Sequence, residues 1–283
     1  MTIPADTSVI KVGGSVLRDA RSYEVIARLL SERMTTEPTW VVVSAAKGVT
    51  DGLDRLRGAG DSEDIRRFLA GHTRATGVSP AAGLEAELRD GWRASFGGSV
   101  QSLFAWGERA STDALRRHLR RLGIEVPVIE LPSRVRLPPV PSALVPGFYL
   151  RDRTGHVRCL PRGGSDISAV LVAAGLRSAR VRLWKDGGGI RVGGESTVTE
   201  VDGASLLHRV RGSIRPLHPV ALRIAIQRGI DLVLEDPFGR HASTLVSCRP
   251  GASARGSHGP PGIRVTLPTP RAPAYPLRLG SPE

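Results

Sequence analysis

The chain has 283 residues, of which 40% are hydrophobic, and a formal net charge of +13 at pH 7. This length suits one large α/β domain, or two lobes that share a sheet. No apolar run is long enough to cross a membrane, and the N-terminus has no basic segment followed by an apolar one, so neither a membrane protein nor a secreted protein is expected.

The composition disfavours two further classes of protein. The two cysteines, Cys159 and Cys248, show neither a disulfide framework nor a metal-binding spacing, so a cytoplasmic protein is expected. The positive charge does not predict a nucleic-acid partner, because the arginines are scattered in short doublets and aromatic residues are not interleaved with them to stack on bases.

In the first half of the chain, strands alternate with helices. A β-branched run predicts a strand at residues 7–12, and an apolar run predicts a buried parallel strand at 40–44. Each strand leads into a small-residue loop and then a helix, the first at about 22–34. Polar helical segments follow over 60–97, with a break near 77–80. The clearest amphipathic helix covers 101–122, and a strand is predicted at 125–130.

A proline-rich crossing at 131–145 leads to a second half of the same kind. The expected elements are a strand at 145–149, a hairpin turn at 152–156, a helix that opens at 162–166 and runs to 174, a strand at 180–184, a helix at 217–228 and a last strand at 230–234. This order predicts an α/β fold, a three-layer αβα sandwich with a mainly parallel central sheet. From about 247 the sequence is rich in Pro and Gly, which predicts a poorly ordered tail where only 262–267 could form a strand.

Lysine is rare in this chain, and every lysine lies in a glycine-rich stretch. Of the 40 lysines and arginines, only Lys11, Lys47 and Lys185 are lysines. Arginine can usually replace a surface lysine, but often not a lysine that must place a compact ammonium on a phosphate. The three lysines therefore indicate phosphate chemistry, and for Lys47 chance retention is an equal alternative.

Two strand ends lead into a glycine pair and a helix, at residues 13–15 and 163–165. Backbone N–H groups and the helix dipole favour an anion at such a place. One glycine pair alone is more often a tight turn, but here one pair adjoins Lys11 and the other lies between Arg162 and Asp166. Neither loop matches the P-loop pattern or the dinucleotide-binding fingerprint.

Longer motifs surround these loops. In chain order they are Lys11-x-Gly13-Gly14-Ser15, Val42-Val43-Ser44-Ala45-x-x-Gly48-Val49-Thr50-Asp51, Gly107-Glu108-Arg109-x-Ser111, Val145-Pro146-Gly147-Phe148, Arg162-Gly163-Gly164-Ser165-Asp166, Trp184-Lys185-Asp186-x-x-Gly189-Ile190 and Leu217-His218-Pro219. Over about residues 8–246, these motifs and their order resemble the amino-acid kinase fold and, within it, the aspartokinases. Residues 247–283 are too short for the pair of C-terminal regulatory (ACT) modules of aspartokinases, so feedback control through such modules is not expected.

The resemblance implies an ATP- and Mg²⁺-dependent kinase that phosphorylates the side-chain carboxylate of aspartate or a close analogue, as a homodimer. The expected absence of regulatory modules and the departures from the family pattern point to a specialised biosynthetic pathway. It implies a kinase domain over 1–246, with an acceptor-binding lobe at about 1–135 and a nucleotide-binding lobe at about 145–246. The implied catalytic residues are Lys11 and Asp166. The implied substrate-binding residues are Ser44, Ala45, Thr50, Glu108, Arg162 and Ser165, and the implied nucleotide-binding residues are Gly13, Gly14, Ser15, Gly164, Lys185, Asp186 and Arg215.

Structural alternatives exist for several of these residues. Arg162 and Asp166 could form a plain helical ion pair, Glu108 could be a first-turn helix residue, and Lys185 with Asp186 could be the polar end of a strand. His218 is expected to pack or cap a helix rather than act in catalysis.

The nucleotide half also departs from the aspartokinase pattern, at 187–196, at Arg215 and at 235–240. Two other functions therefore remain open: the same fold acting on another acid or a phosphonate, and a non-catalytic amino-acid-binding or partner protein.

Overall fold

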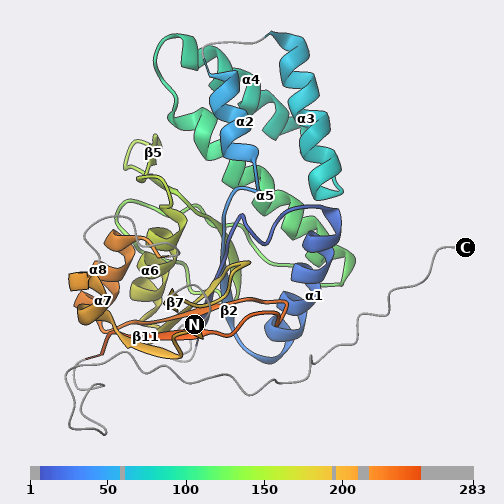
Figure 1. Ribbon diagram of the computed structural model, residues 1–283. Helices are drawn as coiled ribbons and strands as arrows, with labels where there is room; N and C mark the ends of the chain where they lie inside the picture. Colours follow the sequence, from blue (N-terminus) through green and yellow to red (C-terminus); the bar gives the residue numbers. More distant parts are fainter. Residues whose placement is uncertain (1–6, 58–60, 193–195, 210–216, 250–283) are drawn as a thin grey trace, which may run out of the picture.

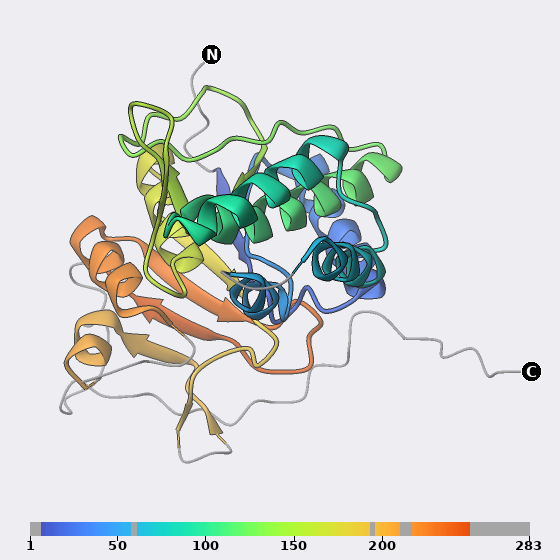
Figure 2. The same ribbon diagram turned by 90° about the horizontal axis from the view of Figure 1, so that it is seen from above.

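The computed structural model describes residues 7–57, 61–192, 196–209 and 217–249, and places helices on both faces of a seven-stranded sheet (Figures 1 and 2). The helices are α1 (Ala20–Thr36), α2 (Val49–Leu56), α3 (Ser62–Thr76), α4 (Ala82–Phe96), α5 (Gln101–Arg121), α6 (Ser165–Leu176), α7 (Gly203–Arg209) and α8 (Pro219–Arg228). The strands are β1 (Ser8–Val12), β2 (Thr39–Val43), β3 (Ala143–Pro146), β4 (Tyr149–Arg151), β5 (Val157–Cys159), β6 (Arg180–Trp184), β7 (Arg191–Val192), β8 (Ser196–Thr197), β9 (Glu200–Asp202), β10 (Asp231–Glu235) and β11 (Thr244–Ser247).

The strand order in the large sheet is β3-β2-β1-β6-β10-β11-β9, and every neighbouring pair is parallel except β10 with β11. Two hydrophobic clusters cover its two faces. One contains residues of α6 and α8, and the other contains residues of α1, α2, α3, α4 and α5. This arrangement confirms the predicted three-layer sandwich with a mainly parallel sheet.

The second strand shows how the sequence produces these layers. All five residues of β2 are buried, as expected for a parallel strand with helices on both sides. Trp40 and Val42 pack in the cluster with α6, whereas Val41 and Val43 pack in the cluster with α5. Successive side chains point to opposite faces of a strand, so an apolar run without alternation fills both cores.

Several predicted elements are confirmed. The break near 77–80 separates α3 from α4, where Gly77 ends α3 with a φ of 73°. The predicted strand at 180–184 is β6, and the predicted turn at 152–156 joins β4 to β5 as an antiparallel hairpin.

Three strand predictions are wrong in part. Residues 125–130 form only an isolated bridge between Val128 and Leu144, because Pro127 lacks the N–H that a strand at this place would donate. The strand predicted at 145–149 is split between β3 and β4, and Phe148 takes a φ of 68° at the break. The strand at 230–234, β10, is not the last one, since β11 follows it. The possible strand at 262–267 lies outside the described residues.

No helix in the described ranges is both long and apolar enough to span a membrane.

Candidate active site

Strands β1, β6 and β10 lie side by side and run parallel, so the segments that follow them meet at one edge of the sheet. The strand order reverses between β1 and β6, because the chain passes from β1 to β2 on one side and reaches β6 later on the other. In open α/β sheets, ligands bind outside the carboxyl ends of the strands at such a reversal. The predicted glycine loop at 13–15 and the predicted pair Lys185 and Asp186 both lie here.

Two lysines from separate strands meet on one carboxylate. Lys11 Nζ lies 3.1 Å from Asp166 Oδ1, and Lys185 Nζ lies 2.8 Å from Asp166 Oδ2. Lys11 comes from β1, Lys185 follows β6, and Asp166 stands in the first turn of α6. Asp166 also accepts the backbone N–H of His218 at 3.3 Å. Lys185, the polar residue directly after β6, thus joins the two predicted catalytic residues.

The charged side chains of Lys11, Asp166 and Lys185 are almost entirely buried. Burial acts to raise the pKa of Asp166, but the positive charges of Lys11 and Lys185 offset it and lower that pKa to about 2. Burial lowers the pKa of Lys185, and the charge of Asp166 opposes this only in part. Asp166 therefore stays ionised at neutral pH and holds both ammonium groups in place.

The glycine turn after β1 is shaped by close backbone neighbours. A Cβ added at Gly14 would lie 2.4 Å from the Ala45 carbonyl oxygen, and one at Gly13 would lie 2.8 Å from the Trp184 carbonyl oxygen. Gly13 donates its N–H to Trp184 O at 3.0 Å, so the expectation that this N–H binds phosphate is wrong. Gly14 and Ser15 N–H have no acceptor among the described residues, so these two donors remain for an anion.

A buried carboxyl group lies behind Lys11. Glu108, in α5, is 5% exposed, and burial raises its pKa to about 8, although the Ala45 N–H and the charge of Lys11 act to lower it. Ser44 Oγ is buried without a hydrogen-bond partner in the described chain. Glu108 is not a first-turn residue, because α5 begins at Gln101, so its helix-dipole alternative is wrong. The Ala45 N–H and the charge of Lys11 both act on Glu108, so the structure brings these three predicted residues together.

Arg162 lies before α6 and is exposed. Its Nη2 pairs with Asp51 Oδ1 at 2.9 Å, next to Thr50 in the first turn of α2. The alternative of a helical ion pair with Asp166 is therefore wrong. An exposed ion pair of this kind contributes little to stability, so Arg162 can exchange Asp51 for another carboxylate.

The loop that carries Arg162 is fixed by packing. A Cβ at Gly164 would lie 2.5 Å from Leu160 Cβ, and a Cβ at Gly147 would lie 2.9 Å from Ser165 Cβ. Gly163 has a φ of 86°, a conformation that favours glycine. The predicted Gly164 and Ser165 thus help to place the first turn of α6, and with it Asp166.

Three further predictions concern the nucleotide side. Asp186 donates its backbone N–H to Ser15 Oγ at 3.2 Å, which joins two of the predicted nucleotide-binding residues. Arg215 lies outside the described residues. His218 caps α8, where its Nδ1 accepts the N–H of Val220 at 3.1 Å, which confirms its expected capping role.

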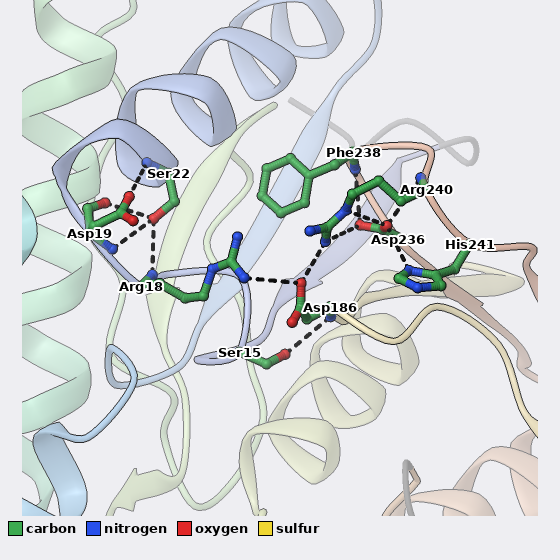
Figure 3. Close-up of polar contacts among 9 residues, drawn as sticks. All are labelled: Ser15, Arg18, Asp19, Ser22, Asp186, Asp236, Phe238, Arg240 and His241. Carbon is green, nitrogen blue, oxygen red and sulfur yellow. Dashed lines mark hydrogen bonds and ion pairs between the residues drawn. The ribbon is translucent and has the colours of Figure 1, made fainter. Parts of the chain in front are cut away.

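Sequence reasoning did not identify Arg18, Asp236 and Arg240. Figure 3 shows the side chains of Arg18 and Arg240 directed toward Asp186, and Asp236 beside Arg240. Asp236 and Arg240 lie in the run of Asp, Pro, Phe, Gly and Arg directly after β10, where the sequence departs from the aspartokinase pattern.

The sequence and fold have known relatives. An aspartokinase of Rickettsia felis is 24% identical over 255 residues, which cover 84% of this chain and 60% of the relative. An aspartokinase of Rickettsia prowazekii is 26% identical over 255 residues, which cover 84% of this chain and 54% of the relative. The chain thus matches little more than half the length of these relatives.

Among solved structures, Escherichia coli aspartokinase III with aspartate and ADP superposes with a TM-score of 0.72 at 20% identity, over 86% of this chain and 65% of that one. This likeness shows the same fold. The model of the amino acid kinase family matches residues 6–236. Since that match spans most of the sequence and the seven-stranded sheet has the corresponding architecture, the chain belongs to the amino acid kinase family.

Proposed function

We propose that this chain uses ATP to phosphorylate the side-chain carboxylate of aspartate or a close amino-acid analogue. The state of Asp166 carries the proposal. Both of its oxygens meet ammonium groups, and its pKa is about 2. Because ammonium groups hold both of its oxygens, we do not assign Asp166 as a general base. The site therefore suits an acceptor that is already ionised, such as a carboxylate, rather than an alcohol.

The relatives support the same pair of substrates. The two Rickettsia proteins are named aspartokinases, and the E. coli structure holds aspartate and ADP. In the proposed step, a carboxylate oxygen of aspartate attacks the γ-phosphorus of ATP while the bond to the leaving ADP oxygen breaks. The products are an acyl phosphate and ADP, and no proton has to move. Phosphoryl transfer of this kind depends mainly on positioning and charge stabilisation.

Lys11 and the glycine turn provide that stabilisation. The ammonium of Lys11 lies 3.4 Å from the position of a Cβ on Gly13, so it is close to the turn that offers the N–H groups of Gly14 and Ser15. These donors would surround the transferring phosphoryl group, where negative charge accumulates. Asp166 would hold Lys11 and Lys185 in fixed positions, so that little reorganisation is needed during transfer.

The acceptor pocket would be formed by the residues around Glu108. A carboxyl group with a pKa of about 8 lacks a sufficient positive partner, and the α-ammonium of an amino acid would supply one. Arg162 would bind the α-carboxylate after leaving Asp51, because a guanidinium matches a carboxylate with two parallel hydrogen bonds. The unpartnered Ser44 Oγ, the Ala45 backbone and Thr50 would complete the pocket.

The nucleotide would lie on the side of Asp186. Mg²⁺, when bound with it, supplies neutralisation of phosphate charge. No three His, Cys, Asp or Glu side chains in the described ranges are grouped to hold a metal by themselves. Mg²⁺ usually binds through one or two carboxylates together with substrate phosphates, and the single carboxylate of Asp186 fits that pattern.

The function is tested by incubating the full chain with ATP, Mg²⁺, hydroxylamine and a panel of amino acids. An acyl phosphate is captured as a hydroxamate, so we expect product with aspartate. If hydroxamate forms only with a different acid, that acid and not aspartate is the acceptor. If no amino acid gives product and ATP does not bind, the chain is a non-catalytic amino-acid-binding or partner protein.

Replacement of Glu108 tests the acceptor pocket. We expect Glu108→Gln to raise the KM for the amino acid by about 10- to 100-fold, since a charged hydrogen bond contributes roughly 1.5–3 kcal/mol, and to leave the KM for ATP unchanged. An unchanged KM for the amino acid would remove Glu108 from the pocket.

The same replacement has a predicted effect on stability. The folded pKa of Glu108, about 8, lies above its ordinary value of 4.5, so its contribution to stability is present below pH 4.5 and is lost as the pH rises to about 8. Without ligand, Glu108→Gln should abolish this loss, which urea unfolding at pH 5 and pH 8 measures.

The proposed function also concerns the division of the chain into two parts and its assembly as a homodimer. We place the acceptor-binding part at about 1–135 and the nucleotide-binding part at about 145–246, because Glu108 and Asp186 lie in these two segments. The homodimer stays a prediction, which sedimentation of the purified chain would check.

A further inference from the structure

Two arginines from opposite ends of the described chain meet on one carboxylate (Figure 3). Arg18 Nη1 lies 3.6 Å from Asp186 Oδ1, and Arg240 Nη2 donates to the same oxygen. Asp186 donates its backbone N–H to Ser15 Oγ at 3.2 Å, so this group adjoins the glycine turn. We call Arg18, Asp186 and Arg240 the arginine clamp.

Arg240 is held in one orientation by the segment that follows β10. Asp236 has a fully buried side chain and accepts Arg240 Nε at 3.0 Å and Nη2 at 3.2 Å. Asp236 also accepts the N–H of Phe238 at 3.1 Å and Nδ1 of His241 at 3.0 Å. The guanidinium carbon of Arg240 stands 4.7 Å from the ring centroid of Phe238. This fixed orientation reduces the conformational entropy that Arg240 loses when it binds a ligand.

Arg18 is fixed through its backbone. Its N–H donates to Ser22 Oγ at 2.9 Å, and Ser22 in turn donates its N–H to Asp19 Oδ1 at 2.8 Å. Asp19 and Ser22 form the capping box at the start of α1, so the side chain of Arg18 projects from a fixed position of the backbone. Its long side chain remains exposed and reaches Asp186.

The clamp is accessible and carries an excess positive charge. The side chains of Arg18, Asp186 and Arg240 are 37%, 36% and 42% exposed, so solvent and ligands reach all three. Exposed ion pairs are worth little, and a phosphate offers each guanidinium two oxygens in the same geometry as a carboxylate. A polyphosphate can therefore take the place of Asp186 at small cost.

The clamp also supplies exposed positive charge, which the buried lysines cannot offer to the outer phosphates. Lys11 and Lys185 are both engaged with Asp166 and nearly buried, so Lys185 does not offer an exposed charge to the outer phosphates. We propose that Arg18 and Arg240 bind the polyphosphate of the phosphoryl donor, and that Asp186 keeps them in position until phosphate oxygens replace its carboxylate. The identity of the donor as ATP rests on the proposed function, whereas the binding of a polyphosphate does not.

The test measures binding of inorganic tripolyphosphate and of ATP to the full chain by titration calorimetry. We expect Arg18→Ala and Arg240→Ala each to weaken the binding of both ligands by about tenfold, the lower end for a charged hydrogen bond, because Asp186 competes for the guanidinium groups. Arg66→Ala is the matched control. Arg66 is exposed on α3 and pairs with Glu63. Its replacement removes the same charge as the other two variants but should leave the affinities for both ligands unchanged.

Arg18→Ala keeps the test decisive if Arg240→Ala fails to fold, because the backbone bonds of Arg18 do not involve its side chain. The clamp would be overturned if Arg18→Ala bound tripolyphosphate and ATP as tightly as the wild type, or if Arg66→Ala lowered both affinities equally. It would also be overturned if the wild-type chain bound neither ligand.

Activity separates the clamp from the proposed function. If the wild type forms aspartyl hydroxamate and Arg18→Ala leaves the KM for ATP unchanged, the clamp is wrong and the function stands. If tripolyphosphate binding depends on both arginines but no hydroxamate forms with any amino acid, the clamp stands and the proposed function is wrong. A purely structural role for the clamp would change the unfolding temperature without changing either affinity.

Discussion

Lys11→Ala is expected to lower the turnover number by at least about 100- to 1,000-fold, the loss seen when one preorganised donor to a transition state is removed. The ammonium of Lys11 adjoins the glycine turn and is held by Asp166 Oδ1, whereas the ammonium of Lys185 is held by the other oxygen of Asp166. The fold should survive, because Asp166 keeps its 2.8 Å contact with Lys185. Hydroxamate formation with aspartate measures turnover, and thermal unfolding measures the fold.

Lys47→Ala is the control for this variant. Lys47 is the third lysine of the chain, lies just before α2 and is exposed. A smaller loss of turnover than in Lys11→Ala is expected from it, because Lys47 forms no ion pair with a carboxylate of the described residues and is exposed. Turnover that persists in a well-folded Lys11→Ala protein would show that the phosphoryl group meets a different cation.

Asp166→Asn is expected to lower the free energy of unfolding by about 3–5 kcal/mol, because it leaves two nearly buried ammonium groups without their common counterion. That is a large part of the 5–15 kcal/mol typical of a folded protein. Urea unfolding at pH 7 measures the change. Asp90→Asn is the control, because Asp90 forms only an exposed pair with Arg93, and its loss should cost under about 1 kcal/mol.

The pH dependence of the same variant has a predicted sign. In the wild type, the pKa of Asp166 is lowered from 3.8 to about 2, so its contribution to stability is lost as the pH falls through that window. In Asp166→Asn, the buried Lys185 loses its counterion, and its folded pKa should fall further below the ordinary lysine value of 10.5. The unfolded chain then binds more protons than the folded one, so stability should rise from pH 7 toward pH 10. Equal stability of variant and wild type at pH 7 would contradict the role given to Asp166.

Most of the fold could be predicted because its signals are local. The buried run of β2, the amphipathic period of α5 and the glycine that separates α3 from α4 each act within a few residues. The failures have local causes too. Pro127 interrupts the pairing expected at 125–130, and β11 is a short strand that lies close to the Pro- and Gly-rich tail.

The candidate site was predicted in its residue types but not in its contacts. Lys11, Glu108, Asp166 and Lys185 were each identified from motifs, but the contact of Asp166 with Lys11 and Lys185 appears only in the tertiary structure. The arginine clamp escaped detection, because Arg18 and Arg240 are separated by most of the chain and belong to no shared motif.

By itself, the sequence determined which residues stand at strand ends and helix starts, because hydrophobic period, glycine pairs and proline act on neighbouring residues. The tertiary structure decided which of those residues meet. The order β2-β1-β6-β10 brings the ends of β1, β6 and β10 to one edge, where Lys11 and Lys185 meet Asp166 and where Arg18 and Arg240 meet Asp186. Such pairings depend on the packing of the whole sheet between its two helical layers, which no short stretch of sequence specifies.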